Sequence, residues 1–553
     1  AALRISPVLA NLLVQRGIDT VEKAEKFFKP NLADLHDPFL MKDMEKAVER
    51  VERAVANNEK IMVYGDYDVD GCTAVALVYK FLRQIGHKNL MFYIPDRYTE
   101  GYGISIKGID LAARKGVGLI IALDCGIKAT EKVVYAKTKG VDFIICDHHL
   151  PAEEIPKAVA VLDPKRVDCS YPFDELSGCG VGFKLVQAYA QKNRMPFEQI
   201  LPLLDLLVVS IASDIVPLVG ENRILAYFGL QQLNSNPSLG LKTIIKISGI
   251  DKEITINDIV FRIGPRINAA GRVESGRKSV ELLTADEKCS AAGIASDINT
   301  FNDQRKKLDH DITEEAIRHI NQSELEPSKK TTVLFNANWH KGVIGIVASR
   351  LTESFYRPTI ILTESNGLAT GSARSVEGFD LYYAISQCSE FLENYGGHKY
   401  AAGLTLKIEN IEPFKQKFER IVRETIDDEM LTPQINIDAK IKLTDITPDL
   451  YHMLQKFAPF GPNNTIPVFM TEKVTNFIGT KRVGRNNEHL KLVIVDDTRA
   501  CNDRSGIGFG MGHLYDKVNS GGFFDICYTL QENEFMGKND IQMIVKDIRL
   551  REE

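Results

Sequence analysis

The sequence predicts an α/β fold with a parallel sheet, followed by a smaller α/β unit and then by an all-β unit. Three observations lead to this prediction. From Lys60 to Leu162, short apolar runs alternate with helical segments, as they do in βαβ units. The alternation resumes at Thr331, after a long segment with helical periodicity. From Leu431 onward, short alternating segments without helical spacing take its place.

Length and composition set the broad class. A chain of 553 residues is too long for one ordinary domain, and 44% hydrophobic with 26% charged residues is typical of a soluble globular protein. No apolar run could span a bilayer and no leader pattern opens the sequence, so no membrane association is expected. Nine cysteines without a C-x-x-C pair indicate reduced thiols and a cytoplasmic location. A net charge of −6 argues against wholesale coating of a polyanion but permits local basic tracks.

The first α/β unit is preceded by residues 1–57, which mix polar helical segments with prolines and carry no recognisable chemistry. The expected strands are Ile61–Tyr64, Leu90–Ile94, Leu119–Leu123, Phe143–Cys146 and Val159–Leu162. The expected helices are Thr73–Ile85, Ser105–Lys115 and Ala129–Lys139.

Three carboxylates follow the first expected strand: Asp66, Asp68 and Asp70 form a D-x-D-x-D-G pattern. Clustered acids repel one another unless a cation neutralises them, so the pattern predicts a divalent-metal site. A calcium loop begins in the same way but requires a Glu at its twelfth position, where this chain has Leu77. The better interpretation is a group of acids at the carboxyl end of a buried strand.

Further acidic or histidine residues end other elements of the unit. They are Asp124 after Leu119–Leu123, Asp147-His148-His149 after Phe143–Cys146, and Asp214 after an apolar helix at Leu201–Ala212. One acid at a strand end is usually a cap or loop residue. Because parallel strands end at one edge of a sheet, four such groups together predict ligands for two divalent cations.

In this order, the D-x-D-x-D-G pattern, the strand-end Asp124, the D-H-H triplet and Ser213–Pro217 resemble the DHH phosphoesterase superfamily. Other motifs resemble the RecJ family of single-strand exonucleases. They are Ile94–Arg97 with Glu100–Gly103, Gly178–Lys184, and Gly264–Arg272. Taken alone, the glycine-rich Gly178–Gly182 segment is a weak signal and lacks the dinucleotide spacing.

The resemblance implies five units along the chain. They are an N-terminal helical extension (1–57), a DHH catalytic domain (58–284), a connecting helix (285–328), a DHHA1 substrate-binding domain (329–428) and an OB-fold (432–553). For the connecting helix, apolar residues at helical spacing favour a structural spacer. The alternative is that its Asn299, Asn302 and Arg305, which share one face, touch substrate.

The second α/β unit is expected to contain strands at Val333–Phe335 and Thr359–Leu362, and helices at Val343–Leu351 and Asp380–Glu393. Its Trp339–Ala348 segment and the G-G-H-x-x-A-A-G pattern of Gly396–Gly403 resemble DHHA1 domains. Paired glycines let a backbone approach an anion, and Arg374 and His398 can donate to phosphate. The alternative is a turn with a satisfied surface histidine.

The all-β unit predicts a small barrel. Its expected strands are Val468–Phe477, Leu490–Val495, Gly506–Gly510, Phe524–Leu530 and Ile541–Ile548, and an OB-fold fits this pattern. A basic patch of Lys481, Arg482, Arg485, His489 and Lys491 suits a single-strand groove, and a solvated hairpin is the competing interpretation. The further C-terminal domain of some RecJ proteins is not expected.

The resemblance also implies roles for individual residues. The metal ligands would be Asp66 and Asp68 on one ion, Asp70, His148 and Asp214 on the other, and Asp124 between them. Asp124 and His149 would be catalytic, with His149 facing the scissile phosphate and Asp147 orienting a metal-ligating histidine. Arg97, Ser372, Arg374 and His398 would bind the 5′ phosphate, and Arg266, Asn268, Arg272, Arg482 and Arg485 the nucleic acid. An oxygen-rich site of this kind favours two Mg²⁺ or Mn²⁺ ions.

The implied function is 5′-to-3′ hydrolysis of single-stranded DNA to 5′-mononucleotides, in recombination and repair. A single-strand-binding protein and a repair helicase would be partners. One alternative is a DHH phosphatase or small-nucleotide phosphodiesterase, which needs neither the barrel nor the arginine-rich Arg262–Arg277 segment. Another is a non-catalytic scaffold, but such relatives have lost ligands and every expected ligand position is occupied here.

Overall fold

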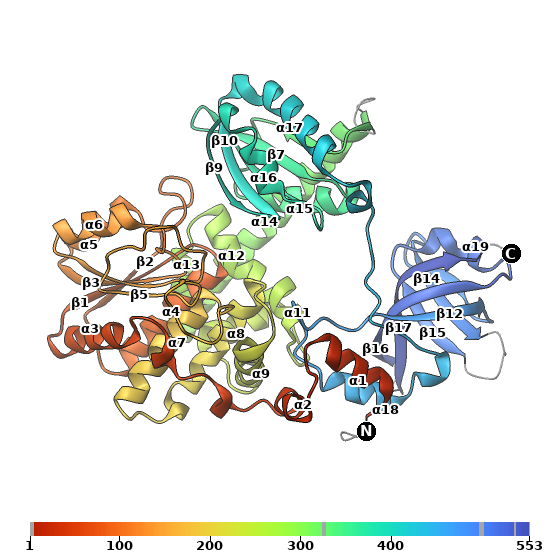
Figure 1. Ribbon diagram of the computed structural model, residues 1–553, viewed down its shortest axis with the longest axis horizontal. Coiled ribbons are helices and arrows are strands. Elements are labelled where there is room, and N and C mark those ends of the chain that lie inside the picture. Colours follow the sequence, from red (N-terminus) through yellow and green to blue (C-terminus); the bar gives the residue numbers. More distant parts are fainter. Residues whose placement is uncertain (1–4, 323–327, 497–502, 536–537, 552–553) are drawn as a thin grey trace.

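The computed structural model describes residues 5–322, 328–496, 503–535 and 538–551. Three sheets organise the chain, and a long helix joins the lobes that hold the first two (Figure 1). No helix within these ranges is long and apolar enough to cross a membrane.

The first sheet is wholly parallel, with the order β2-β1-β3-β4-β5. Its strands are β1 (Lys60–Gly65), β2 (Leu90–Tyr93), β3 (Val117–Leu123), β4 (Asp142–Cys146) and β5 (Ala160–Leu162). The order reverses between β1 and β3, and open α/β sheets bind ligands beyond the carboxyl ends of strands at such a switch point. The predicted parallel sheet is therefore confirmed, and its switch point lies between Asp66 and Asp124.

Helices cover both faces of this sheet, which is why its central strands are apolar throughout. One face packs against α5 (Ile106–Arg114) and α6 (Thr130–Thr138). The other packs against α3 (Met44–Ala56), α4 (Val69–Gln84) and α7 (Gly178–Lys192), and α8 (Leu204–Ser213) packs in turn on α4 and α7. Outside these layers lie α9 (Gly220–Ser235), α10 (Leu239–Ile247), α11 (Ile256–Asp258), a π-helical turn η5 (Ile259–Ile263), α12 (Gly264–Val273) and α13 (Arg277–Leu283).

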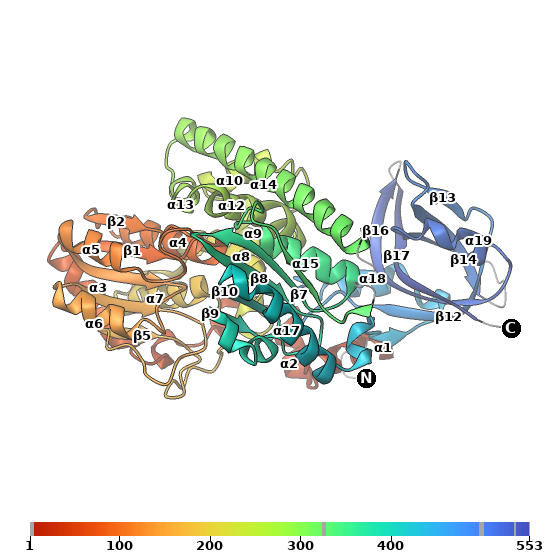
Figure 2. The same ribbon diagram turned by 90° about the horizontal axis from the view of Figure 1, so that it is seen from above.

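The connecting helix is α14 (Lys288–Gln322), which has 35 residues. Its first half packs against α10, α12 and α13, and its second half packs against α15 (Ile344–Phe355) of the second lobe. Figure 2 shows this helix running past both lobes. The helical prediction for this segment is confirmed.

The second sheet is mixed and has the order β6-β7-β8-β10-β9. Its strands are β6 (Thr332–Phe335), β7 (Thr359–Ser365), β8 (Leu368–Arg374), β9 (Leu392–His398) and β10 (Ala401–Leu406), covered by α15, α16 (Leu381–Ser386) and α17 (Ile411–Thr425). The predicted helix Asp380–Glu393 is wrong in its second half, because α16 ends at Ser386 and β9 begins at Leu392. Strand β9 pairs with β10 from Leu392 to His398, and this pairing places the glycine pair inside a strand.

The third sheet closes into a barrel. Strands β12 (Phe469–Asn476), β16 (Phe524–Phe535), β17 (Lys538–Leu550), β15 (Arg504–Gly508) and β14 (His489–Asp496) pair in that order, and β14 pairs back to β12. Two short strands, β11 (Ala439–Lys440) and β13 (Lys481–Val483), extend this ring. The predicted five-stranded barrel is confirmed.

The N-terminal helices tie the barrel to the first lobe. Leu9, Leu12 and Leu13 of α1 (Pro7–Gln15) are buried in the barrel core, next to α18 (Pro448–Gln455). Arg223 of α9 is buried over the ring of Phe27, from α2 (Val21–Phe28), and donates to the Phe457 carbonyl at 2.8 Å. The barrel is thus held against the first lobe by a packed core and a buried guanidinium.

Candidate active site

Acidic side chains from separate elements meet at the switch point of the first sheet. Asp66 directly follows β1, Asp68 is the N-cap of α4, and Asp70 lies in the first turn of that helix. Asp124 follows β3 with a positive φ of 57°, and Asp214 is the C-cap of α8. The sequence pattern therefore places these carboxylates on one rim, as expected for strand and helix ends.

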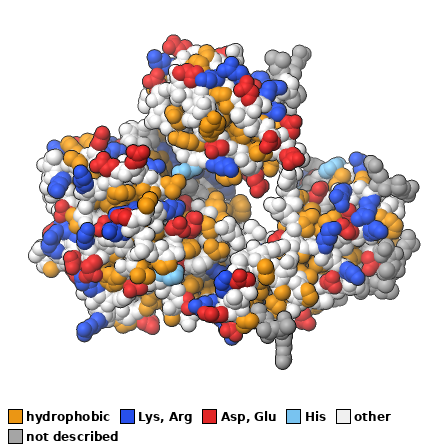
Figure 3. Space-filling view, in the orientation of Figure 1, with side chains coloured by type: hydrophobic (Ala, Val, Ile, Leu, Met, Phe, Trp, Pro, Cys, Tyr) orange, Lys and Arg blue, Asp and Glu red, His pale blue; other side chains and the backbone are white. Residues whose placement is uncertain are grey.

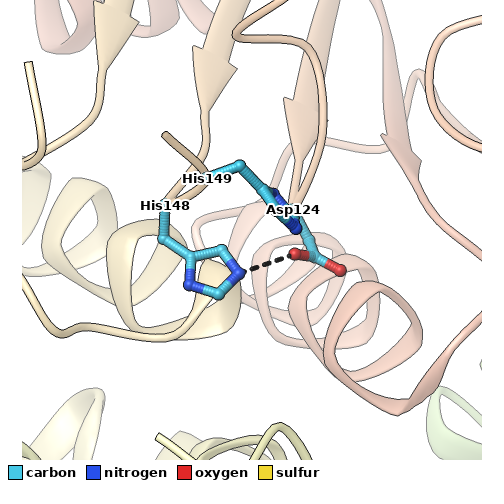
Figure 4. A group of neighbouring side chains, drawn as sticks. All are labelled: Asp124, His148 and His149. Carbon is cyan, nitrogen blue, oxygen red and sulfur yellow. Dashed lines mark ion pairs between the residues drawn. The ribbon is translucent and has the colours of Figure 1, made fainter. Parts of the chain in front are cut away.

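His148 lies close to three of these carboxylates, and Figure 4 shows its ring pointing at Asp124. Its Nε2 is 3.2 Å from Asp124 Oδ1, 3.6 Å from Asp214 Oδ2 and 3.8 Å from Asp70 Oδ2. The ligand atoms of Asp70, His148 and Asp214 lie within 4.8 Å of one another. The same is true of Asp124, His148 and His149. Two overlapping groups of potential ligands therefore share His148.

Several atoms of the rim are buried without a hydrogen-bond partner. They are Asp66 Oδ2, Asp124 Oδ2 and both ring nitrogens of His148. Buried polar atoms are almost always satisfied in folded proteins, so such a concentration of unsatisfied polar atoms requires an explanation. Carboxylate oxygens with one imidazole form a donor set suited to Mg²⁺ or Mn²⁺, and these residues fit divalent cations.

The electrostatics agree with this fit. Burial and neighbouring carboxylates raise the pKa values of Asp66, Asp124 and Asp214 well above their ordinary range. Burial and Asp68 raise the pKa of Asp70 to about 6. Burial and the adjacent His149 lower the pKa of His148 to about 3, which keeps its imidazole neutral. A cation at this rim would reverse the cost of holding these carboxylates ionised.

Asp147 holds His149 in place. Asp147 Oδ1 is 2.7 Å from His149 Nδ1, and its carboxylate also accepts from the backbone amides of Ile127 and His148. Burial raises the pKa of Asp147, but hydrogen bonding and the charge of His149 outweigh it and hold that pKa at about 2. On the other side of the ring, His149 Nε2 is 3.3 Å from the Tyr102 hydroxyl. The histidine next to Asp147 is thus His149, and its ring is fixed from both nitrogens.

The structure also shows supports that the sequence reasoning missed. Asp70 accepts from the Gly178 amide at 2.6 Å, the Cys179 amide at 2.8 Å and the Ser210 hydroxyl at 2.6 Å. The glycine-rich Gly178–Gly182 segment is the first turn of α7, whose N-terminus favours a negative charge. The signal for this support in the sequence was a group of glycines at the start of an apolar helical segment.

Asp66 and Asp68 stand slightly apart from the other acids. Asp66 Oδ1 is 3.5 Å from the Gly103 amide, and Asp68 Oδ1 accepts from Gly71 at 2.9 Å. Among the residues described, neither belongs to a group of three ligands within 4.8 Å. The structure therefore brings together Asp70, Asp124, His148 and Asp214 most closely.

A basic cleft lies between the two α/β lobes, and Figure 3 shows Lys and Arg side chains at the back of the recess between them. Arg97 lies 4.1 Å over the ring of Tyr67, and Arg272 donates to the Gly342 carbonyl at 2.9 Å across the cleft. Burial and the nearby Arg97, together with other guanidinium groups, lower the pKa of Arg272 to about 9. Cations crowded in this way favour a bound anion.

Ser372 and Arg374 lie on β8, facing the start of α15. Ser372 Oγ accepts from Arg374 Nη1 at 3.1 Å. A Cβ at Gly345, in the first turn of α15, would be 3.0 Å from Ser372 Oγ and 3.3 Å from Arg374 Nη2. Glycine keeps this space open at a helix N-terminus, where an anion is favoured. His398, at the end of β9, faces the rim closely enough that His149 and two lysines add to partial burial in lowering its pKa.

The other predicted nucleic-acid residues have different surroundings. Asn268 faces the cleft, and its Oδ1 is buried without a partner. Arg266 is held by Asn299 at 3.2 Å and by the Arg262 carbonyl at 2.7 Å. In the barrel, Arg482 pairs with Asp516 at 2.7 Å, and Arg485 is exposed in the loop after β13. The structure does not bring these two barrel residues near the rim.

Comparisons with known proteins identify the family. Profiles of the DHH family N-terminal domain, the DHHA1 domain and the RecJ OB domain match residues 60–211, 328–424 and 437–547. The single-stranded-DNA-specific exonuclease RecJ of Bacillus subtilis is 37% identical over 553 residues, which cover 100% of this chain and 69% of that protein. The enzyme of the same name from Salmonella typhimurium is 31% identical, with 98% and 96% covered.

Solved structures agree. A crystal structure of RecJ in complex with Mn²⁺ from Thermus thermophilus superposes with a TM-score of 0.85 at 25% identity, covering 100% of this chain and 77% of that one. A structure of exonuclease RecJ bound to manganese matches with a TM-score of 0.62 at 30% identity, covering 72% and 97%. This chain therefore belongs to the RecJ family of single-stranded-DNA-specific exonucleases.

Proposed function

We propose that this chain degrades single-stranded DNA from its 5′ end and releases 5′-mononucleotides. The observation that carries this proposal is the pairing of a carboxylate and histidine rim with a cleft that holds four arginines. The rim suits divalent cations, and the cleft suits a polyanion. We also propose the domain division 1–57, 58–284, 285–328, 329–428 and 432–553 for the units that supply them.

Divalent ions held by the rim residues would supply an activated water and would neutralise charge on the phosphoryl oxygens. Asp66 and Asp68 would hold one ion, Asp70, His148 and Asp214 would hold the other, and Asp124 would serve both. The supports of Asp70 described above hold that carboxylate in one orientation. His149, fixed by Asp147, donates to the scissile phosphate.

The chain end is held by a separate group. Arg97, Ser372, Arg374 and His398 grip the terminal 5′ phosphate, at the N-terminus of α15. Arg266, Asn268 and Arg272 contact the strand near the rim, and Arg482 and Arg485 contact it on the barrel. Phosphate contacts carry no base information, so cleavage should be independent of sequence and sensitive to salt.

The barrel and the basic cleft favour a polymer over a dinucleotide substrate, because a small substrate needs neither. We further propose a cytoplasmic location, a role in recombination and repair, and a single-strand-binding protein and a repair helicase as partners. The test is a single strand labelled at its 5′ or 3′ end and incubated with Mn²⁺ or Mg²⁺. Immediate release of a labelled mononucleotide from the 5′ end supports the proposal, whereas release from the 3′ end contradicts it.

A further inference from the structure

A small cavity lies between the metal rim and the connecting helix. It measures about 140 Å³ and lies where α4, α8, α12, α14 and α15 meet. Its lining includes Val69, Ser213, Asn268, Arg272, Arg305 and Ile346. Val69 lies between Asp68 and Asp70, and Ser213 precedes Asp214, so the cavity adjoins the rim directly.

Three polar atoms around this cavity lack hydrogen-bond partners. Ser213 Oγ, Asn268 Oδ1 and Arg305 Nε are each buried without a hydrogen bond. Leaving a buried donor or acceptor unpaired costs about 1–3 kcal/mol. The Ser213 hydroxyl and the Arg305 Nε–H are therefore unpaired donors that suit a ligand with several acceptor atoms, whereas Asn268 Oδ1 is an acceptor and calls for a donor.

The charge of the cavity selects an anion. Arg272 and Arg305 both line it, and burial lowers the pKa of Arg272 together with the charges of Arg97, Arg305 and Arg374. The carboxylate whose charge acts on Arg305 is Asp309, which pairs with Arg350 at 2.8 Å. Two cations therefore face the cavity, and the main acid beside Arg305 is already engaged elsewhere.

The size of the cavity selects a small group. A volume of about 140 Å³ is well below the roughly 300–1,000 Å³ of pockets that enclose whole small molecules. A phosphate fits this space, whereas a base with its sugar does not. The cavity also differs in position from the group formed by Ser372 and Arg374. These two side chains belong to β8 of the second sheet and lie beside Gly345 of α15.

A contact within α14 orients the Arg305 guanidinium. Its Nη2 donates to Asn302 Oδ1 at 3.1 Å, and Asn302 is fully buried. This contact orients the guanidinium while leaving Nε unpaired. The connecting helix thus presents a fixed cation to the cavity, beyond its role as a spacer.

We propose that this cavity is a subsite for an internal phosphate of the bound strand, with Arg305 as its principal donor. The inference rests on the proposed function. It adds a second phosphate grip, separate from the one for the 5′ end and next to the metal rim. The connecting helix then contributes directly to substrate binding.

The test uses 5′-phosphorylated single strands in which one linkage at a time is a neutral methylphosphonate. Binding is measured in EDTA for the wild type, Arg305→Gln, Arg305→Lys and Arg318→Gln. Arg318 is the matched control, because it is an exposed arginine on the same helix and does not line the cavity. We expect Arg305→Gln to weaken binding of the unmodified strand about 10-fold or more, Arg305→Lys to restore part of this loss, and Arg318→Gln to have little effect.

The proposal is tested by whether the effect of the Arg305→Gln substitution on binding depends on which linkage is neutral. At one internal linkage, the methylphosphonate should weaken wild-type binding but add little further loss to Arg305→Gln, because both changes remove the same contact. If the methylphosphonate weakened the binding of Arg305→Gln as much as that of the wild type at every linkage, the proposal would be overturned. A strand with a 5′ hydroxyl is compared as well, and the proposal would also be overturned if Arg305→Gln were coupled only to the loss of the 5′ phosphate. Melting curves check folding, and if Arg305→Gln is unfolded, the same comparison is made with Arg305→Lys. Turnover of the unmodified strand by the wild type in Mn²⁺ tests the proposed function separately.

Discussion

Gly178 lies against Asp124 so closely that a side chain does not fit between them. A Cβ at position 178 would be 2.6 Å from Asp124 Cβ and 2.7 Å from its Cα, well inside van der Waals contact. The amide of the same glycine donates to Asp70 at 2.6 Å. One residue thus sets the separation of two carboxylates on the rim.

Gly178→Ala should therefore displace Asp124 and lower turnover at least tenfold. Overpacking of this kind typically costs about 1–3 kcal/mol of stability. Gly180→Ala is the matched control, because its Cβ would meet nothing nearer than Leu176 Cβ at 3.3 Å. Steady-state cleavage and melting of both variants test this, and equal effects would contradict the role assigned to Gly178.

Asp124→Asn should abolish cleavage and leave binding of the strand largely intact. The substitution keeps the shape of the side chain but removes the charge that lies 3.2 Å from His148. Cleavage of a labelled strand and its binding in EDTA are measured side by side. Turnover close to that of the wild type would contradict the position of Asp124 between two ions.

Arg374→Ala should reduce degradation of 5′-phosphorylated strands more than that of strands with a 5′ hydroxyl. A charge-assisted contact is worth about 1.5–3 kcal/mol, so a preference ratio should fall about 10-fold or more. Arg423→Ala serves as a control, because Arg423 is exposed on α17 and pairs with Glu419. An equal loss on both substrates would remove the proposed contact with the chain end.

Metal binding should stabilise the protein more at high pH than at low pH. The pKa of Asp70 rises from 3.8 to about 6 in the folded chain without metal, so the folded state binds the extra proton. The metal-free protein should accordingly lose stability as the pH rises from about 4 through 6. Because metal ions displace protons from the carboxylates, the rise in Tm caused by Mn²⁺ should be greater at about pH 8 than at about pH 5. The same rise at both pH values would contradict these shifts.

Glu221→Gln should destabilise the catalytic lobe by about 3–5 kcal/mol, since it leaves a buried charge unpaired. Glu221 accepts from Lys184 at 2.9 Å, and both side chains are almost fully buried. Burial lowers the pKa of Lys184. Urea denaturation should show this loss, and Lys184→Met combined with Glu221→Gln should recover part of it. The exposed pair of Lys192 and Glu45 is the control, for which Glu45→Gln should cost less than about 1 kcal/mol.

The sequence alone was sufficient to predict where the strands of the first sheet end. The alternation of apolar runs and helical segments predicts a parallel sheet, and residues that follow its strands, such as Asp66 and Asp124, then lie on one edge. It was insufficient where tertiary contacts decide. The segment after Ser386 forms a strand because β10 pairs with it, and local helical spacing does not reveal a partner strand. The roles of Gly178 and Arg305 depend on neighbours far away in the chain, Asp124 in one case and the cavity in the other.

The attachment of the barrel sets a fixed spacing. Leu9, Leu12 and Leu13 in its core, and Arg223 between α9 and the Phe457 carbonyl, leave little freedom for a tethered module to search for DNA. A flexible tether raises the local concentration of a second site over a range of strand lengths, whereas a rigid one favours a single length. The distance from the barrel to the rim should then set a minimum strand length. The affinity for single-stranded DNA should rise abruptly once a strand is long enough to reach both.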